Sequence, residues 1–315
     1  MKRHVVVTGG AGFIGSNLVD KLLKDGFSVT VIDNFSTGFE RYLDVDNVRV
    51  VQRDLTCAEP DELAVDFGGA NTVYHLAANA DVRYGWQHPR LDHEQNLVAT
   101  LNVLDACEKA GVPDVVFSST GSVYGETHEI PTPERAMFPL QTSLYAASKV
   151  AAEAFLQAHA TAGRVRATIF RFVSVLGPRY SHGHVFDFVR QLRRSPDRLT
   201  ILGDGTQRKS YMHVDDCVAA LTSLRPAGDL EVFNLGADGY CTVSDSATWI
   251  SSRLGLEPTY EFTGGNRGWV GDNPFIYLDV SKAAAAGWTT HKTIKESVEE
   301  TVDWLVDNDW IFDAR

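Results

Sequence analysis

The chain has 315 residues, of which 44% are apolar, and it carries a formal net charge of -12. This size predicts one large domain, or a large domain with a smaller lobe, each with a proper hydrophobic core. The acidic balance disfavours nucleic acid and anionic membranes as partners, because an acidic surface repels both.

Four scattered cysteines form no CxxC pair and have no histidines at zinc spacing; they are Cys57, Cys107, Cys217 and Cys241. We therefore expect reduced cysteines, a cytoplasmic protein and no metal site. The start, MKRHVVVTGG, has an apolar run too short for a signal peptide, and nothing resembles a transmembrane segment.

In the first half of the chain, short β-branched runs alternate with helical patterns. Strands are expected at 4–9, 28–33, 48–54, 72–78, 114–120 and 165–172. Helices are expected from about Asn17, from about His93 and around Tyr145. Continuous apolar strands separated by helices predict a parallel sheet covered on both faces. Right-handed crossovers then give a doubly wound, Rossmann-type α/β fold.

The second half is less regular and ends in a helix. We expect residues 1–173 to form a dinucleotide-binding domain, with chain returns near 211–238 and 275–282. Residues 174–315 are expected to form mainly a smaller mixed α/β lobe for the substrate. In such folds ligands bind at the carboxyl ends of the strands.

The segment TGGAGFIGS follows the first expected strand and opens a helix. Its glycines Gly9, Gly12 and Gly15 permit a tight turn, a close approach of the backbone to a pyrophosphate, and close packing of helix on strand. The helix start offers free N–H groups and a positive dipole end to the anion. Phe13 and Ile14 belong to the same turn. The segment predicts a dinucleotide site.

Asp33 ends the second strand, about 20 residues beyond the glycines, where an acid binds a ribose 2′-hydroxyl. An acid there would repel a 2′-phosphate, so the residue favours NAD over NADP. Asn34 is its neighbour. Asp54, followed by Leu55, ends the third strand and is either an adenine contact or a turn acid.

Tyr145 and Lys149 lie four residues apart in LYAASKVAAEAF and share one helix face. An isolated pair of this kind is usually a surface tyrosine and a solvated lysine. An ammonium beside a phenol lowers the phenol's pKa, so the tyrosine could act as a general base. Upstream, Thr120 and Ser122 are either hydroxyls for the same substrate oxygen or turn residues.

In their order and spacing, these segments resemble the extended short-chain dehydrogenase/reductase family over essentially the full length. The motifs are TGGAGFIGS, VIDN, RDL, HLAA, HEQNLVAT, SSTGSVYGE, YAASK, LGPR, GDGTQ and RGWVGD. The resemblance implies the catalytic set Thr120, Tyr145 and Lys149, a bound NAD and a nucleotide-sugar substrate. It also implies further cofactor contacts from Leu76, Ala77, Ala78, Asn96 and Phe172.

Within this family, hexose 4,6-dehydratases carry an Asp-Glu pair after the catalytic threonine, and UDP-glucuronate decarboxylases a glutamate at the second position. This chain has Gly121 and Ser122 there. The remaining reaction is 4-epimerisation, and the overall resemblance is to UDP-glucose 4-epimerases, which implies a homodimer built on helices at about 93–110 and 143–162. The alternatives are another nucleotide-sugar enzyme of the family, which is a reductase, a dehydratase or a UDP-glucuronate decarboxylase or epimerase, or an NAD-sensing regulator without catalysis.

The resemblance also suggests residues that bind the UDP-sugar, which is either glucose/galactose or an N-acetylhexosamine. Ser174 stands where many 4-epimerases have asparagine. Lys209 takes the place of a usual arginine, and Arg208 beside it could compensate for the lost bidentate fork.

Four more residues complete the expected substrate set. Arg267 and Asp272 are candidates for the diphosphate or the ribose, and Arg179 either contacts the diphosphate or caps a loop. Ile276 falls near a position that sets pocket size, and its size leaves room for an N-acetyl group. His182 and His184 have no further ligands at metal spacing and are expected to be loop residues.

Overall fold

The computed structural model describes residues 3–82, 85–138, 140–269, 272–273 and 275–315. The strands are β1 (His4–Thr8), β2 (Ser28–Asp33), β3 (Arg49–Gln52), β4 (Thr72–His75), β5 (Asp114–Thr120), β6 (Arg166–Phe172), β7 (Ser174–Leu176), β8 (Arg198–Ile201), β9 (Arg208–Lys209), β10 (Tyr211–His213), β11 (Leu230–Leu235), β12 (Cys241–Thr242), β13 (Thr259–Phe262) and β14 (Phe275–Ile276).

The helices are α1 (Phe13–Lys24), α2 (Pro60–Asp66), α3 (Pro89–Asp92), α4 (Ala99–Ala110), α5 (Leu144–Thr161), α6 (His184–Arg194), α7 (Val214–Ser223), α8 (Val243–Arg253), α9 (Ser281–Ala285) and α10 (Ile294–Asp307). A π-helical segment, His93–Val98, joins α3 to α4. Short 3₁₀ turns cover Glu40–Tyr42, Gly121–Tyr124 and Asp309–Phe312. Among the described helices, none has the length and hydropathy needed to cross a membrane.

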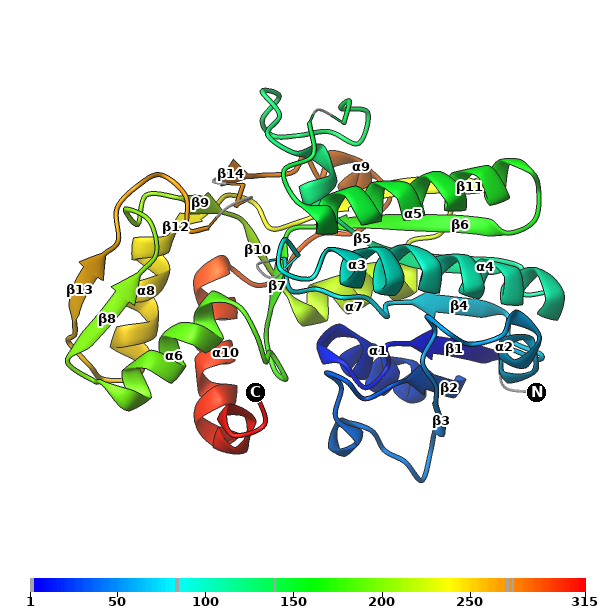
Figure 1. The fold of residues 1–315 in the computed structure, drawn as a ribbon, viewed down its shortest axis with the longest axis horizontal. Helices are drawn as coiled ribbons and strands as arrows, with labels where there is room; N and C mark the ends of the chain where they lie inside the picture. Colours follow the sequence, from blue (N-terminus) through cyan, green and yellow to red (C-terminus); the bar gives the residue numbers. More distant parts are fainter. Residues whose placement is uncertain (1–2, 83–84, 139, 270–271, 274) are drawn as a thin grey trace. The chain divides into compact units, whose positions relative to one another are not determined.

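A seven-stranded sheet in the order β11-β6-β5-β4-β1-β2-β3 organises the first half of the chain (Figure 1). The pairs β1–β2, β1–β4, β2–β3, β4–β5 and β5–β6 are all parallel. Because β1 lies between β4 and β2, the chain winds outward in both directions from the sheet centre. The doubly wound α/β fold predicted from the alternation of strands and helices is confirmed.

Both faces of this sheet are covered, which explains why its strands are apolar at consecutive positions. Val5, Val6 and Val7 of β1 are all buried. Val6 belongs to a core cluster that includes Leu104 of α4 and Leu156 of α5. Neighbouring residues of a strand point to opposite faces, so Val5 and Val7 pack on the other side of the sheet. The strand runs therefore lack the polar alternation of a sheet with one solvated face.

The chain divides into two compact units. The first contains Met1–Val123, Ser143–Phe172 and Val218–Asn234, and the second contains Tyr124–Thr142, Val173–Cys217 and Leu235–Arg315. Two details differ from the expected domain boundaries. The loop before α5 belongs to the second unit, and so does β14, because β14 pairs with β9. The return to the seven-stranded sheet is made by β11 alone.

The second unit has three small sheets and a group of helices. β10 pairs with β7, β13 pairs with β8, and β9 lies between β12 and β14. Helices α6, α8 and α10 pack on one another. Helices α8 and α10 each begin with a capping box, at Thr242 and Thr293. In each box the threonine is hydrogen-bonded to the acidic residue three positions later.

His75, at the end of β4, is buried and ties three elements together. One ring nitrogen is 2.7 Å from the Thr8 hydroxyl of β1, and the other is 3.0 Å from the Thr100 hydroxyl of α4. Burial lowers the pKa of His75 from its ordinary 6.5 to about 3. The folded protein therefore holds this imidazole neutral over a range in which the unfolded chain protonates it.

This difference makes stability fall with acidity. Between pH 6.5 and about 3 the unfolded state binds one more proton at His75, so the free energy of unfolding decreases as pH falls. The loss should approach about 1.4 kcal/mol per pH unit. Urea unfolding at a series of pH values should show a shallower acid slope for His75→Gln than for the wild type. His128→Gln, at an exposed histidine, is the control; equal slopes in all three proteins would contradict the assignment.

Candidate active site

The turn between β1 and α1 needs glycine for steric reasons. Gly9 has a φ of 69°, and a Cβ on it would lie 2.7 Å from the Ala77 nitrogen in the loop after β4. A Cβ on Gly15 would lie 2.1 Å from the Gly9 oxygen. A Cβ on Gly12 would meet only the Gly9 oxygen, at 3.2 Å. The outer two glycines therefore bring backbones together, while the middle one leaves a more open surface.

The start of α1 can receive an anion. Gly12 is its N-cap and makes no side-chain cap bond, and no acid occupies the first turn. A helix start of this kind offers backbone N–H groups and the positive end of the dipole to an anion. Phe13 and Ile14 are the first residues of α1, and their contact with a pyrophosphate stays a prediction.

Asp33 lies at the carboxyl end of β2 beside this turn. Its carboxylate accepts hydrogen bonds from the Ala11 nitrogen at 3.0 Å and from the Phe35 nitrogen at 2.8 Å. Burial raises the pKa of Asp33, and the backbone N–H bonds oppose that rise. The glycine turn therefore holds the acid at a fixed position, and the residues fit a dinucleotide whose ribose it would bind.

The remaining candidates near β2 and β4 have mostly structural contacts. Asp54 accepts the nitrogen and hydroxyl of Thr56 at 2.9 and 2.7 Å, which is the geometry of a turn acid. Asn34 donates to Asp54 at 3.4 Å, and the Leu55 carbonyl accepts from Asn102 at 2.8 Å. Leu76, Ala77 and Ala78 follow β4; the first two bond Thr8, and Phe172 ends β6.

Ser143 caps α5 and accepts from the Ala146 nitrogen at 3.1 Å, which fixes where the helix begins. Tyr145, which is half-buried, and Lys149, which is buried, lie in its first two turns. The Thr120 hydroxyl, at the end of β5, is hydrogen-bonded to the Tyr145 phenol. The same hydroxyl accepts from the Ser122 nitrogen at 3.1 Å, so Ser122 contributes its backbone here.

The predicted lowering of the Tyr145 pKa is not observed in the protein alone. Burial raises the pKa of Tyr145 to about 12, because the phenolate loses solvation; the hydrogen bond from Thr120 opposes this, and Asp92 adds to it. Without a ligand, the phenol stays protonated at neutral pH. Base chemistry at Tyr145 therefore needs further positive charge close to its oxygen.

Lys149 is buried, with 2% of its surface exposed, so it is not a solvated surface lysine. Its ammonium donates to the Ser118 carbonyl at 2.9 Å and lies 4.7 Å from the centre of the Phe117 ring. Burial lowers the pKa of Lys149 to about 8, while Glu153 and Asp92 oppose the fall. Lys149 stays protonated at neutral pH because two buried acids, Glu153 and Asp92, offset the desolvation of its ammonium.

Glu153 lies one turn beyond Lys149 and was not singled out from the sequence. It is fully buried and pairs with Arg171 of β6, whose Nη2 donates to Oε2 at 2.7 Å. The Ser119 hydroxyl also donates to Glu153. The i, i+4 spacing from Lys149 was the available signal for this acid. The pair joins α5 to the two strands that carry the catalytic end of the sheet.

Asn96 lies in the π-helical segment and is 1% exposed. Its Oδ1 accepts from the Asn79 nitrogen at 2.8 Å, and its Nδ2 donates to the Ser148 hydroxyl at 3.0 Å. It therefore links the loop after β4 to α5. Irregular π turns inside helices are frequent at functional sites.

Most substrate candidates belong to the second unit, where their charges are already paired. The Lys209 ammonium lies 2.8 Å from Asp272, which is 3% exposed. Arg267 forms a bidentate pair with Glu126, at 2.7 and 2.9 Å, and also donates to the Asp272 carbonyl. The two ion pairs are thus joined through the backbone of Asp272. Val270 and Gly271, of the RGWVGD motif, lie outside the described residues.

Arg208, Ser174 and Ile276 occupy strand positions in the second unit. The guanidinium of Arg208 lies 4.0 Å from the centre of the Phe275 ring. Ser174 is exposed and pairs with Tyr211, while Ile276 is half-buried and pairs with Lys209. Arg179 has a φ of 73°.

His184 lies 2.8 Å from the Ser246 hydroxyl, which gives it a structural partner. Across the described ranges, no group of three or more His, Cys, Asp or Glu side chains is arranged to hold a metal ion.

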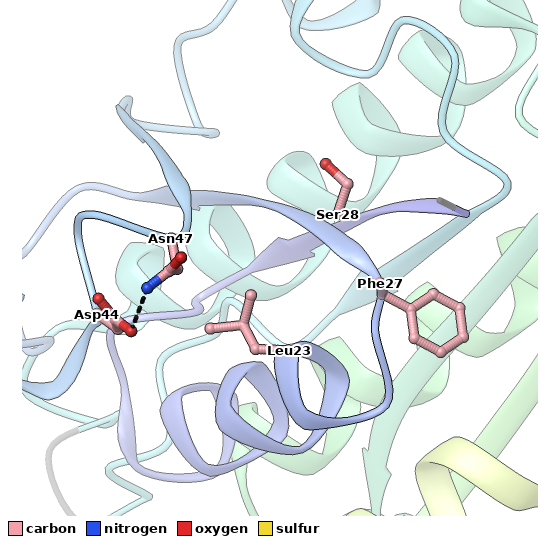
Figure 2. A pocket seen from close by; sticks show the side chains of 5 residues that line it. All are labelled: Leu23, Phe27, Ser28, Asp44 and Asn47. Atoms are coloured by element: carbon pink, nitrogen blue, oxygen red, sulfur yellow. Dashed lines mark hydrogen bonds between the residues drawn. The ribbon is translucent and has the colours of Figure 1, made fainter. Parts of the chain in front are cut away.

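A hollow elsewhere on the first unit is lined by Leu23, Phe27, Ser28, Asp44 and Asn47 (Figure 2). Asn47 donates to Asp44 across it at 2.7 Å. Ser28 is the first residue of β2, so the hollow lies at the amino ends of the strands. The glycine turn, Asp33 and Thr120 lie at the carboxyl ends, so the hollow is separate from the candidate site.

The family model for the NAD dependent epimerase/dehydratase family matches residues 5–236. The chain belongs to this family. NAD is the family's cofactor, as the sequence predicted.

Three known proteins illustrate the similarity. A UDP-glucose 4-epimerase of Mycolicibacterium smegmatis is 32% identical over 96% of this chain and 98% of its own length. UDP-glucuronic acid decarboxylase 1 of Arabidopsis thaliana is 34% identical over 82% of this chain and 60% of its own length. A crystal structure of UDP-glucose 4-epimerase from Thermotoga maritima with UDP-glucose matches 97% of this chain and 99% of its own, with a TM-score of 0.88 and 32% identity. The relatives thus share the UDP-sugar class but not one reaction.

Proposed function

We propose that this protein is a UDP-sugar 4-epimerase that works through a transient 4-keto sugar and keeps its NAD bound. The observation that carries the proposal is the cluster of Thr120, Tyr145 and Lys149, with Gly121 and Ser122 directly after the threonine. The cluster can move a proton at a sugar hydroxyl. Neither residue after Thr120 supplies the acid that dehydratases and decarboxylases of this family carry there.

In the proposed reaction, Tyr145 accepts the proton of the sugar 4-hydroxyl, and Thr120 donates a hydrogen bond to that oxygen. When bound, NAD would supply a hydride acceptor and donor for C4 and a positive ring that favours the phenolate. Lys149 adds a second positive charge and, one turn from Tyr145, can hold the nicotinamide ribose. Tyr145 returns the proton when the alcohol re-forms, so no net redox change occurs.

We assign the nucleotide part of the substrate to the second unit. Arg208, Lys209, Arg267 and Arg179 are the proposed diphosphate ligands, with Asp272 for the ribose. Lys209 and Arg267 are held by Asp272 and Glu126 in the free protein, so a diphosphate would have to compete with these carboxylates or join them. Ser122, Ser174 and Ile276 are the proposed sugar contacts.

We further propose a homodimer formed by the helical segments at about 93–110 and 143–162, in the cytoplasm. All four cysteines are free, which fits a reducing compartment. A sensor function is disfavoured because the Tyr145–Lys149 pair is present and buried around a hydroxyl partner.

The test is turnover of a panel of UDP-sugars by purified protein, followed by nuclear magnetic resonance without added NAD or reductant. The panel contains UDP-glucose, UDP-galactose, their N-acetylamino forms and UDP-glucuronate. Interconversion at C4 of at least one pair is the expected result. Release of carbon dioxide from UDP-glucuronate, with no C4 inversion, would replace the proposal by a decarboxylase. No change in any sugar would refute it.

A further inference from the structure

Asp92 is a buried carboxylate next to the catalytic cluster that the proposed mechanism does not use. It ends α3 and is 1% exposed. Its Oδ1 accepts from Asn79 Nδ2 at 2.8 Å and, more weakly, from Asn96 Nδ2 at 3.4 Å. Within the described residues its Oδ2 has no hydrogen-bond partner. A buried acid with one unsatisfied oxygen is costly, so it needs a reason to be there.

The unsatisfied oxygen lies in a narrow space. A Cβ on Gly85 would lie 2.7 Å from Asp92 Oδ2 and 3.7 Å from the Cβ of Leu144, the first residue of α5. Asp92 therefore lies between the backbone at position 85 and the tyrosine end of α5. Glycine at position 85 leaves room for the carboxylate.

A chain of hydrogen bonds runs from Asp92 to the backbone of the catalytic tyrosine. Asn96 Nδ2, near Asp92, donates to the Ser148 hydroxyl at 3.0 Å. That hydroxyl donates to the Tyr145 carbonyl at 2.7 Å. Asn79, the other partner of Asp92, donates its backbone N–H to Asn96 at 2.8 Å. The carboxylate thus orients two amides that fix both α5 and the loop after β4.

The charge of Asp92 acts on the same two catalytic groups. It raises the pKa of Tyr145 and that of Lys149, because a nearby anion favours the neutral phenol and the charged ammonium. The charged groups that act on Asp92 itself are Lys149 from α5 and Asp81 from the loop after β4. Glu153 is the second acid that acts on Lys149.

We propose that Asp92 is a positioning residue of the reaction, which fixes Tyr145 through Asn96 and Ser148 and holds a negative charge beside the Tyr145–Lys149 pair. The role of Asp92 in turnover rests on the proposed function above, whereas its hydrogen bonds and its charge beside Tyr145 and Lys149 do not depend on that function.

Asp92→Asn keeps an oxygen for Asn79 but removes the charge. Both limbs of the pH profile of kcat/KM should then move to lower pH, by about one unit each, because Tyr145 and Lys149 both lose a proton more easily. Asp92→Glu should move them back toward the wild type. Asp105→Asn, which removes an exposed acid from α4, should leave the profile unchanged.

A second readout needs no turnover. Protein labelled with ¹³C at the tyrosine Cζ reports phenol ionisation directly, and Tyr145→Phe assigns the signal. In Asp92→Asn, the Tyr145 signal should titrate at lower pH than in the wild type. This result would stand even if no UDP-sugar were epimerised, so failure of the proposed function and failure of the Asp92 proposal can be told apart.

Gly85→Ala is a second variant, for the case that Asp92→Asn does not fold. Its added methyl displaces the Asp92 carboxylate without removing it, and the end of that side chain can move at little cost. We expect a smaller shift in the same direction. Ser148→Ala separates the two roles, because it breaks the chain to Tyr145 and keeps the charge; it should lower kcat and leave the pH limbs in place. The proposal would be overturned if Asp92→Asn folds and both its pH profile and its Tyr145 titration match those of the wild type. If Asp92→Asn does not fold, the same outcome in Gly85→Ala would overturn it.

Discussion

Replacing Tyr145 with phenylalanine should lower kcat by about 10³-fold, within the range that a positioned acid–base group contributes. The change removes one oxygen from a buried site, and Thr120 is the partner that loses a hydrogen bond. Thr120 can still accept from the Ser122 nitrogen, so the fold should survive. The measurement is initial rate on the sugar that the wild type turns over best, together with NAD content and thermal melting.

Tyr74→Phe is the matched control. Tyr74 is a buried tyrosine of the first unit, and its hydroxyl accepts from Arg225 at 2.8 Å. Its loss should affect stability and leave kcat within about threefold, because the residue belongs to β4 and not to the catalytic cluster. If Tyr145→Phe keeps full activity, and Tyr74→Phe has the same activity, proton transfer by Tyr145 is not part of the reaction.

Replacing Arg171 with methionine should lower the free energy of unfolding by about 3–5 kcal/mol, because it leaves Glu153 buried and unpaired. Side-chain exposures of 5% for Arg171 and 0% for Glu153 leave the remaining acid little access to water. Urea unfolding measures this loss.

Arg166 provides the control on the same strand. It pairs with Asp114 at 2.8 and 2.9 Å, but its side chain is 53% exposed. Arg166→Met should cost no more than about 1 kcal/mol. The double variant Glu153→Leu/Arg171→Met should recover part of the lost stability, because no charge stays buried. If Arg166→Met and Arg171→Met lower the free energy of unfolding equally, burial of the Arg171–Glu153 pair adds nothing to its contribution to stability.

The fold could be predicted because its determinants are local. Consecutive buried valines in β1, a glycine turn directly after them and an acid ending β2 define a doubly wound dinucleotide fold from sequence position alone. Tyr145 and Lys149 could be predicted to share a face because helix geometry fixes the i, i+4 relation. Neither prediction depends on knowing which distant residues meet.

The surroundings of that pair could not be predicted, because they depend on contacts between distant segments. Arg171 reaches Glu153 only when β6 packs beside α5. Asn96, which links Asp92 to Ser148 of α5, lies in a π-helical turn that no spacing rule indicates. The expected fall in the Tyr145 pKa was wrong for the ligand-free protein, since the sequence shows the lysine but not the depth of burial. Desolvation outweighs the hydrogen bond from Thr120.

The most direct measurement of the central claim is the reaction of UDP-glucose in D₂O, read by proton and deuterium nuclear magnetic resonance. If Tyr145 moves only a hydroxyl proton and the hydride of C4 returns to C4, the product has inverted C4 and carries no solvent deuterium on C4 or C5. The same result should hold for any sugar of the panel that turns over. Solvent deuterium at C5 would show proton abstraction beside the ketone and would contradict the account, as would product formation without inversion at C4.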